Sequence, residues 1–165
     1  MDFDFYVSKF QEAAEMLDKK ILSQKQIEAA VGIFKDDSVF LKLYKKSWSN
    51  DPENALQAES RIFFSIWVND KLLQEEKIYY NIHALKLRKL KGYSIESRKF
   101  AELFRSRFKS FENSWKNVST KFGPLTLMEG WIEIDQKNLQ NQIVFLAKHF
   151  FEIEYLIDDC LTQFI

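Results

Sequence analysis

The sequence predicts an all-α protein: a single helical domain over residues 1–165, folded as a multi-helix bundle, with a short extended or loop element at about 122–135. Glycine and proline are scarce, at four and two residues, whereas sandwiches and barrels need many turns rich in both. Apolar side chains recur at steps of three and four, which is typical of helices. No internal repeat and no flexible linker divides the chain, so we expect one folded unit.

Three helices are predicted before Asn50. The first, at about residues 3–19, carries an apolar stripe on one face. Ser23 is a candidate N-cap for the second helix, and Asp36 or Asp37 for the third. The apolar faces of these two helices would hold Ile27, Val31 and Phe34, and then Phe40, Leu43, Tyr44 and Trp48.

A long helix is predicted next, at about residues 53–91. Pro52 suits its first turn and Gly92 its C-terminal end. Asp70 interrupts its apolar stripe, so a break near that residue is compatible with the pattern. The stripe consists of Phe63, Ile66, Leu73, Tyr80, Ala84 and Leu87.

Two further helices are predicted in the C-terminal half. One covers about residues 95–116, with an almost entirely aromatic stripe, and the other covers about 137–163, with a wide apolar face. Between them, residues 117–136 hold Gly123-Pro124 and Gly130 and are the least helical part of the chain. We expect a structured loop there, extended around Leu125–Leu127 or formed as a short strand pair.

The sequence lacks the common catalytic and cofactor motifs. It has no glycine-rich phosphate loop, no nucleophile elbow and too few cysteines and histidines for a zinc site, so neither a cofactor nor a metal is expected. His83, His149 and Cys160 are interpreted as structural or surface residues. We therefore expect a non-enzyme, and a helical enzyme with an unfamiliar site is the least favoured alternative.

A cytoplasmic location is expected. The N-terminus is acidic where a signal peptide would be basic, and no apolar run is long enough to span a membrane. The single cysteine does not imply an oxidising compartment.

Positive charge gathers in residues 86–121, which hold eleven lysines and arginines against three glutamates, a surplus of eight. One interpretation is a solvated helix face, and the alternative is a nucleic-acid-binding surface of a regulatory protein. The residues of this alternative basic surface are Lys86, Arg88, Lys89, Lys91, Arg98, Arg105 and Arg107.

Negative charge gathers in residues 122–165, which hold seven acids against two lysines. Such a surface would attract a basic protein partner. The candidate partner-binding residues are six of these acids, with two aromatic anchors: Glu129, Trp131, Glu133, Asp135, Glu152, Tyr155, Asp158 and Asp159.

Two stretches, Gly92-Tyr93-Ser94-Ile95-Glu96-Ser97-Arg98-Lys99-Phe100-Ala101 and Phe122-Gly123-Pro124-Leu125-Thr126-Leu127-Met128-Glu129-Gly130-Trp131, resemble small α-helical bacterial immunity proteins. These proteins belong to contact-dependent growth-inhibition systems, which pair a toxin with its immunity protein in a toxin–antitoxin-like manner. The resemblance covers mainly residues 80–135. It implies a toxin inhibitor that acts by protein–protein interaction in the bacterial cytoplasm and blocks the active site of a cognate toxin domain, expected to be a nuclease.

Overall fold

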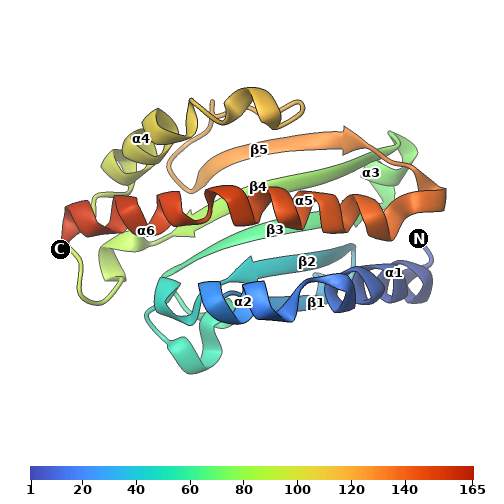
Figure 1. Ribbon diagram of the computed structural model, residues 1–165, viewed down its shortest axis with the longest axis horizontal. Coiled ribbons are helices and arrows are strands. Elements are labelled where there is room, and N and C mark those ends of the chain that lie inside the picture. The colour runs from blue at the N-terminus through green and yellow to red at the C-terminus, as the bar shows by residue number, and fades with distance from the viewer.

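The computed structural model describes residues 1–165 and shows a mixed α/β protein. A five-stranded antiparallel sheet forms its centre, and helices cover one face of that sheet (Figure 1). The prediction of an all-α bundle was therefore wrong, because three of the predicted helices are strands.

The sheet is a simple meander. Its strands follow one another in sequence order, and each is antiparallel to the next. They are β1 (Glu28–Phe34), β2 (Ser38–Tyr44), β3 (Arg61–Asn69), β4 (Lys77–Leu85) and β5 (Thr126–Glu133). The extended element expected at about 122–135 is β5, and it pairs with β4.

The helices are α1 (Phe3–Met16), α2 (Lys19–Lys25), α3 (Asp70–Gln74), α4 (Ser97–Phe108), α5 (Leu139–Ile153) and α6 (Tyr155–Leu161). Helices α5 and α6 run one after the other along the sheet, with α1 and α2 beside them (Figure 1). Helix α4 lies near the β5 edge, and α3 is a single turn between β3 and β4. The predicted helices at 3–19, 95–116 and 137–163 correspond to α1, to α4, and to α5 with α6, whereas α2 was not predicted as a separate helix.

Alternation along the strands creates two different faces. Every second side chain of the central strands points toward the helices and is buried, for example Leu41 in β2, Phe64 in β3 and Ile82 in β4. The Phe64 ring stacks on Phe150 of α5 with 4.5 Å between ring centroids. These residues belong to a single core cluster of 39 buried residues, which fixes the sheet against α1, α5 and α6.

Most turns of the sheet do without glycine. The β1–β2 hairpin turns through Lys35 and Asp36, with φ of 51° and 58°. Glu76 and Lys86 adopt similar left-handed conformations at the two ends of β4, with φ of 57° and 47°. Such conformations are unusual for residues other than glycine. The scarcity of glycine therefore did not exclude a sheet, and this is why the argument from turn composition failed.

The predicted break near Asp70 lies where β3 gives way to α3. The Asn69 side chain caps that helical turn, since its Oδ1 accepts a hydrogen bond from the Leu72 amide at 2.8 Å. The chain on either side, predicted as one helix over 53–91, forms β3 and β4 instead. The second and third predicted helices are likewise replaced by β1 and β2.

One arginine organises the loop that leads into β5. The Arg105 guanidinium of α4 donates hydrogen bonds to the carbonyl oxygens of Phe122, Gly123, Thr126 and Leu127, at 2.8–3.1 Å. These bonds satisfy backbone groups of a segment with little regular structure. Arg105 thereby fixes the place at which the chain enters the sheet beside β4.

Candidate functional site

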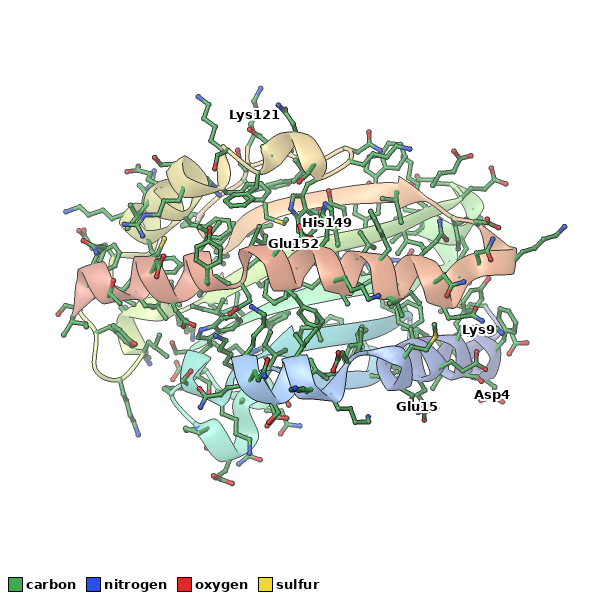
Figure 2. The ribbon with its side chains drawn as sticks, viewed as in Figure 1. Asp4, Lys9, Glu15, Lys121, His149 and Glu152 are labelled. Carbon is green, nitrogen blue, oxygen red and sulfur yellow. The ribbon has the colours of Figure 1, made fainter.

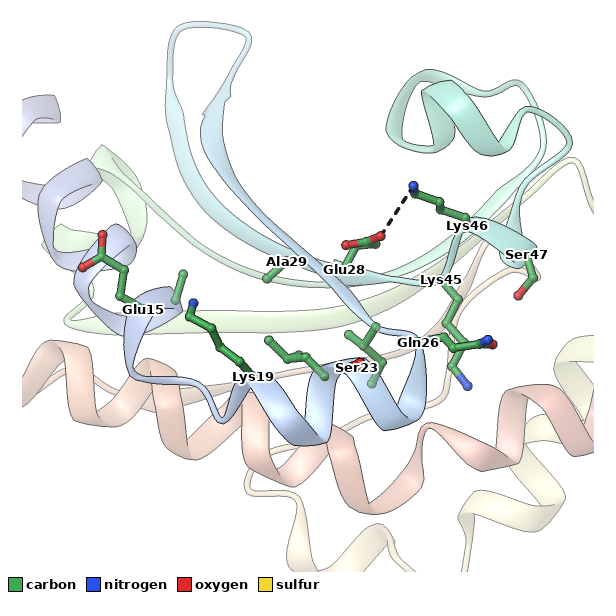
Figure 3. A pocket seen from close by; sticks show the side chains of 12 residues that line it. Glu15, Lys19, Ser23, Gln26, Glu28, Ala29, Lys45, Lys46 and Ser47 are labelled. Atoms are coloured by element: carbon green, nitrogen blue, oxygen red, sulfur yellow. Dashed lines mark ion pairs between the residues drawn. The ribbon is translucent and has the colours of Figure 1, made fainter.

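One cleft lies between α2 and the start of β1. Its volume is about 810 Å³, and most of the 12 lining residues are polar (Figure 3). Two of its lysines are paired: Lys46 lies 3.7 Å from Glu28, and Lys45 is bound to Glu154 and Asp158. Lys45 and Lys46 therefore have carboxylate partners within the protein, which leaves little reason to assign an anionic ligand to this cleft.

A second cleft, of about 470 Å³, lies on the face of the sheet that the helices do not cover. We call this face the open face. The lining side chains come from the end of β1, the β1–β2 turn, β2, β3 and β4, and the opposite side chains of β2, β3 and β4 form the core. Alternation of side chains along a strand therefore makes the same segments build both the core and this cleft.

The register of the strands places the open-face side chains in rows across the sheet. The aromatic row consists of Phe40, Trp67, Tyr79 and Trp131, each opposite the next on neighbouring strands. The polar row beside it consists of Lys42, Ser65, Asn81 and Glu129. Within the aromatic row, the rings of Trp67 and Tyr79 lie 5.6 Å apart.

Basic side chains meet at one end of the polar row. Lys42 lies over aromatic rings, with its Nζ 4.5 Å from the Phe40 ring centroid and 4.6 Å from that of Phe63. The Arg61 guanidinium lies 5.5 Å from the same Phe63 ring, and its Nε is buried without a hydrogen-bond partner. Neither Lys42 nor Arg61 forms an ion pair with a carboxylate.

Burial and mutual repulsion act on the basic groups of this cleft. Burial, with a smaller contribution from the Arg61 charge, lowers the pKa of Lys42 to about 8. Burial also lowers the pKa of His83 to about 4, and the charges of Lys42 and Arg61 add to this effect. The cleft thus concentrates positive charge in surroundings that do not compensate it.

Hydrogen bonds hold the polar row in place. The Ser65 hydroxyl donates to Oδ1 of Asn81 at 3.0 Å, and the Asn81 amide donates to Oε1 of Glu129 at 3.1 Å. The same amide lies 2.7 Å from Nε2 of His83, which can accept only when the ring is neutral. The His83 ring stacks on Phe63 with 5.4 Å between centroids. This network fixes the neutral imidazole as one wall of the cleft.

We expect acid to destabilise the protein through His83. Its folded-state pKa of about 4 lies below the ordinary 6.5, so the unfolded chain takes up the proton first. The stability that neutral His83 contributes is present above about pH 6.5 and is lost as the pH falls toward 4, on the order of 2–3 kcal/mol. Urea unfolding of the wild type and of His83→Gln over this pH range isolates the effect. Equal losses of stability in the two proteins would contradict it.

The predicted partner-binding residues do not form one surface. Glu129, Trp131 and Glu133 lie together on β5 and point to the open face, where Lys77 Nζ lies 4.3 Å from the Trp131 ring. The other predicted residues lie elsewhere. Glu152 is exposed on α5 (Figure 2), and Tyr155 and Asp159 lie on α6. Asp158 is bound to Lys45 and Trp48. Asp135 caps the turn that leads into α5.

The predicted basic surface is partly used inside the fold. Lys86 and Lys89 share the carboxylate of Glu59, at 3.0 and 2.7 Å, and Arg105 binds the loop before β5. Arg88, Lys91, Arg98 and Arg107 form no ion pair. The charge surplus of residues 86–121 therefore does not translate into an equally large free basic surface.

The sequence interpretation missed Lys42 and Arg61 and treated His83 as structural. The signal that could have found them is alternation: Phe40-x-Lys42 in β2, Arg61-x-Phe63-x-Ser65-x-Trp67 in β3 and Asn81-x-His83 in β4 each place polar and aromatic residues on one face.

Neither clusters of metal-binding side chains nor likeness to known proteins points to a further site. No group of three or more histidine, cysteine, aspartate or glutamate side chains is placed to hold a metal ion. None of the helices has the length and apolar character needed to cross a membrane. No protein-family model matches the chain, and neither the curated proteins nor the solved structures contain a match.

Proposed function

We propose that this protein is a non-enzymatic binding protein of the immunity type, which holds a cognate toxin domain against the open face of its sheet. The observation that carries the proposal is the aromatic row, a line of large rings on a sheet face that no helix covers. Aromatic side chains contribute strongly to protein interfaces, and large uncovered apolar patches on a folded protein mark interaction sites. The resemblance of residues 92–101 and 122–131 to immunity proteins supplies the kind of partner.

Charge at the end of the aromatic row supports a basic partner. Glu129 and Glu133 flank Trp131 on β5, the edge strand of the sheet. A nuclease needs a positively charged cleft to hold its substrate, so such a cleft would be attracted to this edge and covered by the neighbouring rings. In this proposal the complex forms in the cytoplasm, where the toxin acts.

Protection of growth tests the proposal. Cells that express the toxin domain encoded beside the gene for this protein are expected to grow only when the protein is co-expressed. Trp131→Ser removes the ring at the β5 end of the aromatic row, between the two glutamates, and should weaken the complex by about 2 kcal/mol, near 30-fold in affinity, with a corresponding loss of protection. A urea-unfolding curve confirms that the variant is folded.

The control is Tyr155→Ser on α6, because Tyr155 is also a large aromatic residue that reaches the surface, at 44% exposed, but lies on the helical side. It should leave both affinity and protection unchanged. Failure of the wild type to bind or protect would refute the immunity proposal, and a loss confined to Tyr155→Ser would place the interface on the helices. Salt-sensitive retention of RNA without toxin binding would favour the nucleic-acid alternative instead.

A further inference from the structure

The cleft in the open face has the composition of a site for an anion. Its basic groups come from three strands: Lys42 from β2, Arg61 from β3 and His83 from β4. Other charged groups nearby are Lys35 and Asp37 in the β1–β2 turn, and Glu129, which is on the far side of Asn81. Asp37 and Glu129 form no ion pair with Lys42 or Arg61, so the positive charge of this cleft has no carboxylate partner within the protein.

Aromatic rings line the same cleft. Phe34, Phe40, Phe63 and Trp67 contribute to its wall. The tip of the Phe40 ring lies against Gly32, where a Cβ atom would come within 2.9 Å of it, so the glycine leaves room for the ring beside β1. Aromatic side chains can stack with a planar ring of a ligand. The volume of the cleft, about 470 Å³, falls in the range of sites that hold small molecules.

We propose that this cleft binds a small organic anion that carries a planar ring, with the charge between Lys42 and Arg61 and the ring among Phe34, Phe40 and Phe63. The Arg61 guanidinium donates to the Ala58 carbonyl oxygen through Nη1 and has further N–H groups that could bind such a ligand. Nucleotides and aromatic carboxylates both have this chemistry. The site does not depend on the toxin-binding proposal, because it concerns one cleft of the open face and needs no protein partner.

Protonation of Lys42 is linked to this binding. The anion requires the charged ammonium, whose pKa in the free protein is about 8. For a carboxylate ligand, whose charge is constant above about pH 6, affinity should be steady up to about pH 7 and fall by about tenfold by pH 9. The other groups facing Lys42 do not produce this fall: Arg61 stays charged, and His83 is already neutral throughout this range.

Calorimetric and NMR titrations of the whole protein test the proposal with four probes: adenosine monophosphate, benzoate, adenosine and inorganic phosphate. The first two combine a ring with a charge, and at least one of them should bind at least tenfold more tightly than adenosine or phosphate. Whichever of the nucleotide and the carboxylate binds more tightly indicates the chemical class of the natural ligand.

The variant Lys42→Met should weaken that binding by at least tenfold. It removes a half-buried charge that has no carboxylate partner, so it should fold about as well as the wild type, and Lys42→Arg should retain most of the affinity. Lys46→Met, at the exposed lysine of the other cleft, is the matched control and should bind like the wild type. Absence of saturable binding by both ring-bearing anions, or equal affinity of Lys42→Met and wild type, would overturn the proposal, whatever the outcome with the toxin domain.

Discussion

Replacing Lys45 with methionine is expected to lower the free energy of unfolding by about 3–5 kcal/mol. The Lys45 ammonium lies 2.7 Å from Oε2 of Glu154 and 2.6 Å from Oδ2 of Asp158. Glu154 is only 4% exposed, so without Lys45 it would keep a buried charge paired with Lys25 alone, at 3.1 Å. Burial by itself would lower the pKa of Lys45, but hydrogen bonds and charges from Asp158 and Glu154 outweigh it and raise the pKa.

Urea unfolding measures this effect, and two comparisons sharpen it. Lys46→Met changes the neighbouring lysine, whose side chain is 57% exposed, and should alter stability by less than about 0.5 kcal/mol. Lys45→Met combined with Glu154→Gln removes the orphaned charge and should recover part of the loss. A loss below about 1 kcal/mol in the single variant would mean that Glu154 reaches solvent or takes up a proton.

Replacing Gly130 with alanine is the second change expected to have a large effect, a loss of about 3 kcal/mol. A Cβ atom at Gly130 would lie 2.2 Å from the hydroxyl oxygen of Tyr80 and 3.0 Å from the carbonyl oxygen of Asn117. Tyr80 is fully buried, and its hydroxyl donates to the Lys116 carbonyl at 2.7 Å, so the ring cannot move aside without losing that bond. The glycine is therefore required by a close approach between neighbouring strands.

The matched control for this prediction is Gly123→Ala, because nothing lies within 4 Å of a Cβ atom at Gly123. Its unfolding midpoint in urea should stay close to that of the wild type, whereas the midpoint of Gly130→Ala should fall clearly. If the two alanine variants have the same unfolding midpoint in urea, the contact between Tyr80 and Gly130 is looser than the geometry indicates. Gly123 and Gly130 were both predicted to shape the backbone, and this comparison separates their roles.

The helical parts of the fold could be predicted because their apolar stripes have one interpretation. Leu139, Ile143, Leu146, Phe150 and Ile153 are all buried on α5, and no alternation of period two competes with that pattern. The central strands were misread because both of their faces carry apolar side chains. Phe63 and Ile66 fit a helical step of three, yet they point to opposite faces of β3. The open-face rings therefore concealed the period that marks a strand.

The candidate site was less accessible to sequence reasoning than the helices. Charge was counted along the chain, whereas Lys42, Arg61 and His83 come together only through strand register. Lys42 lies opposite Ser65, which lies opposite Asn81, although these residues are far apart in sequence. A surplus of lysine and arginine in one segment, such as residues 86–121, does not show how many of these charges are paired within the fold. Of the predicted partner-binding residues, Glu129, Trp131 and Glu133 could be grouped because they alternate on one strand.

The order of elements along the chain has a consequence for synthesis on the ribosome. Each strand pairs with a neighbour in sequence, so hairpins can form as soon as they emerge. Helix α5, which covers Phe64 and the middle of the sheet, follows all five strands. In a nascent chain interrupted before residue 139, α1 can cover β1 and β2, but the apolar face around Phe64 is still uncovered and prone to aggregate. We therefore expect the sheet to reach its stable form only once the last helices have been synthesised.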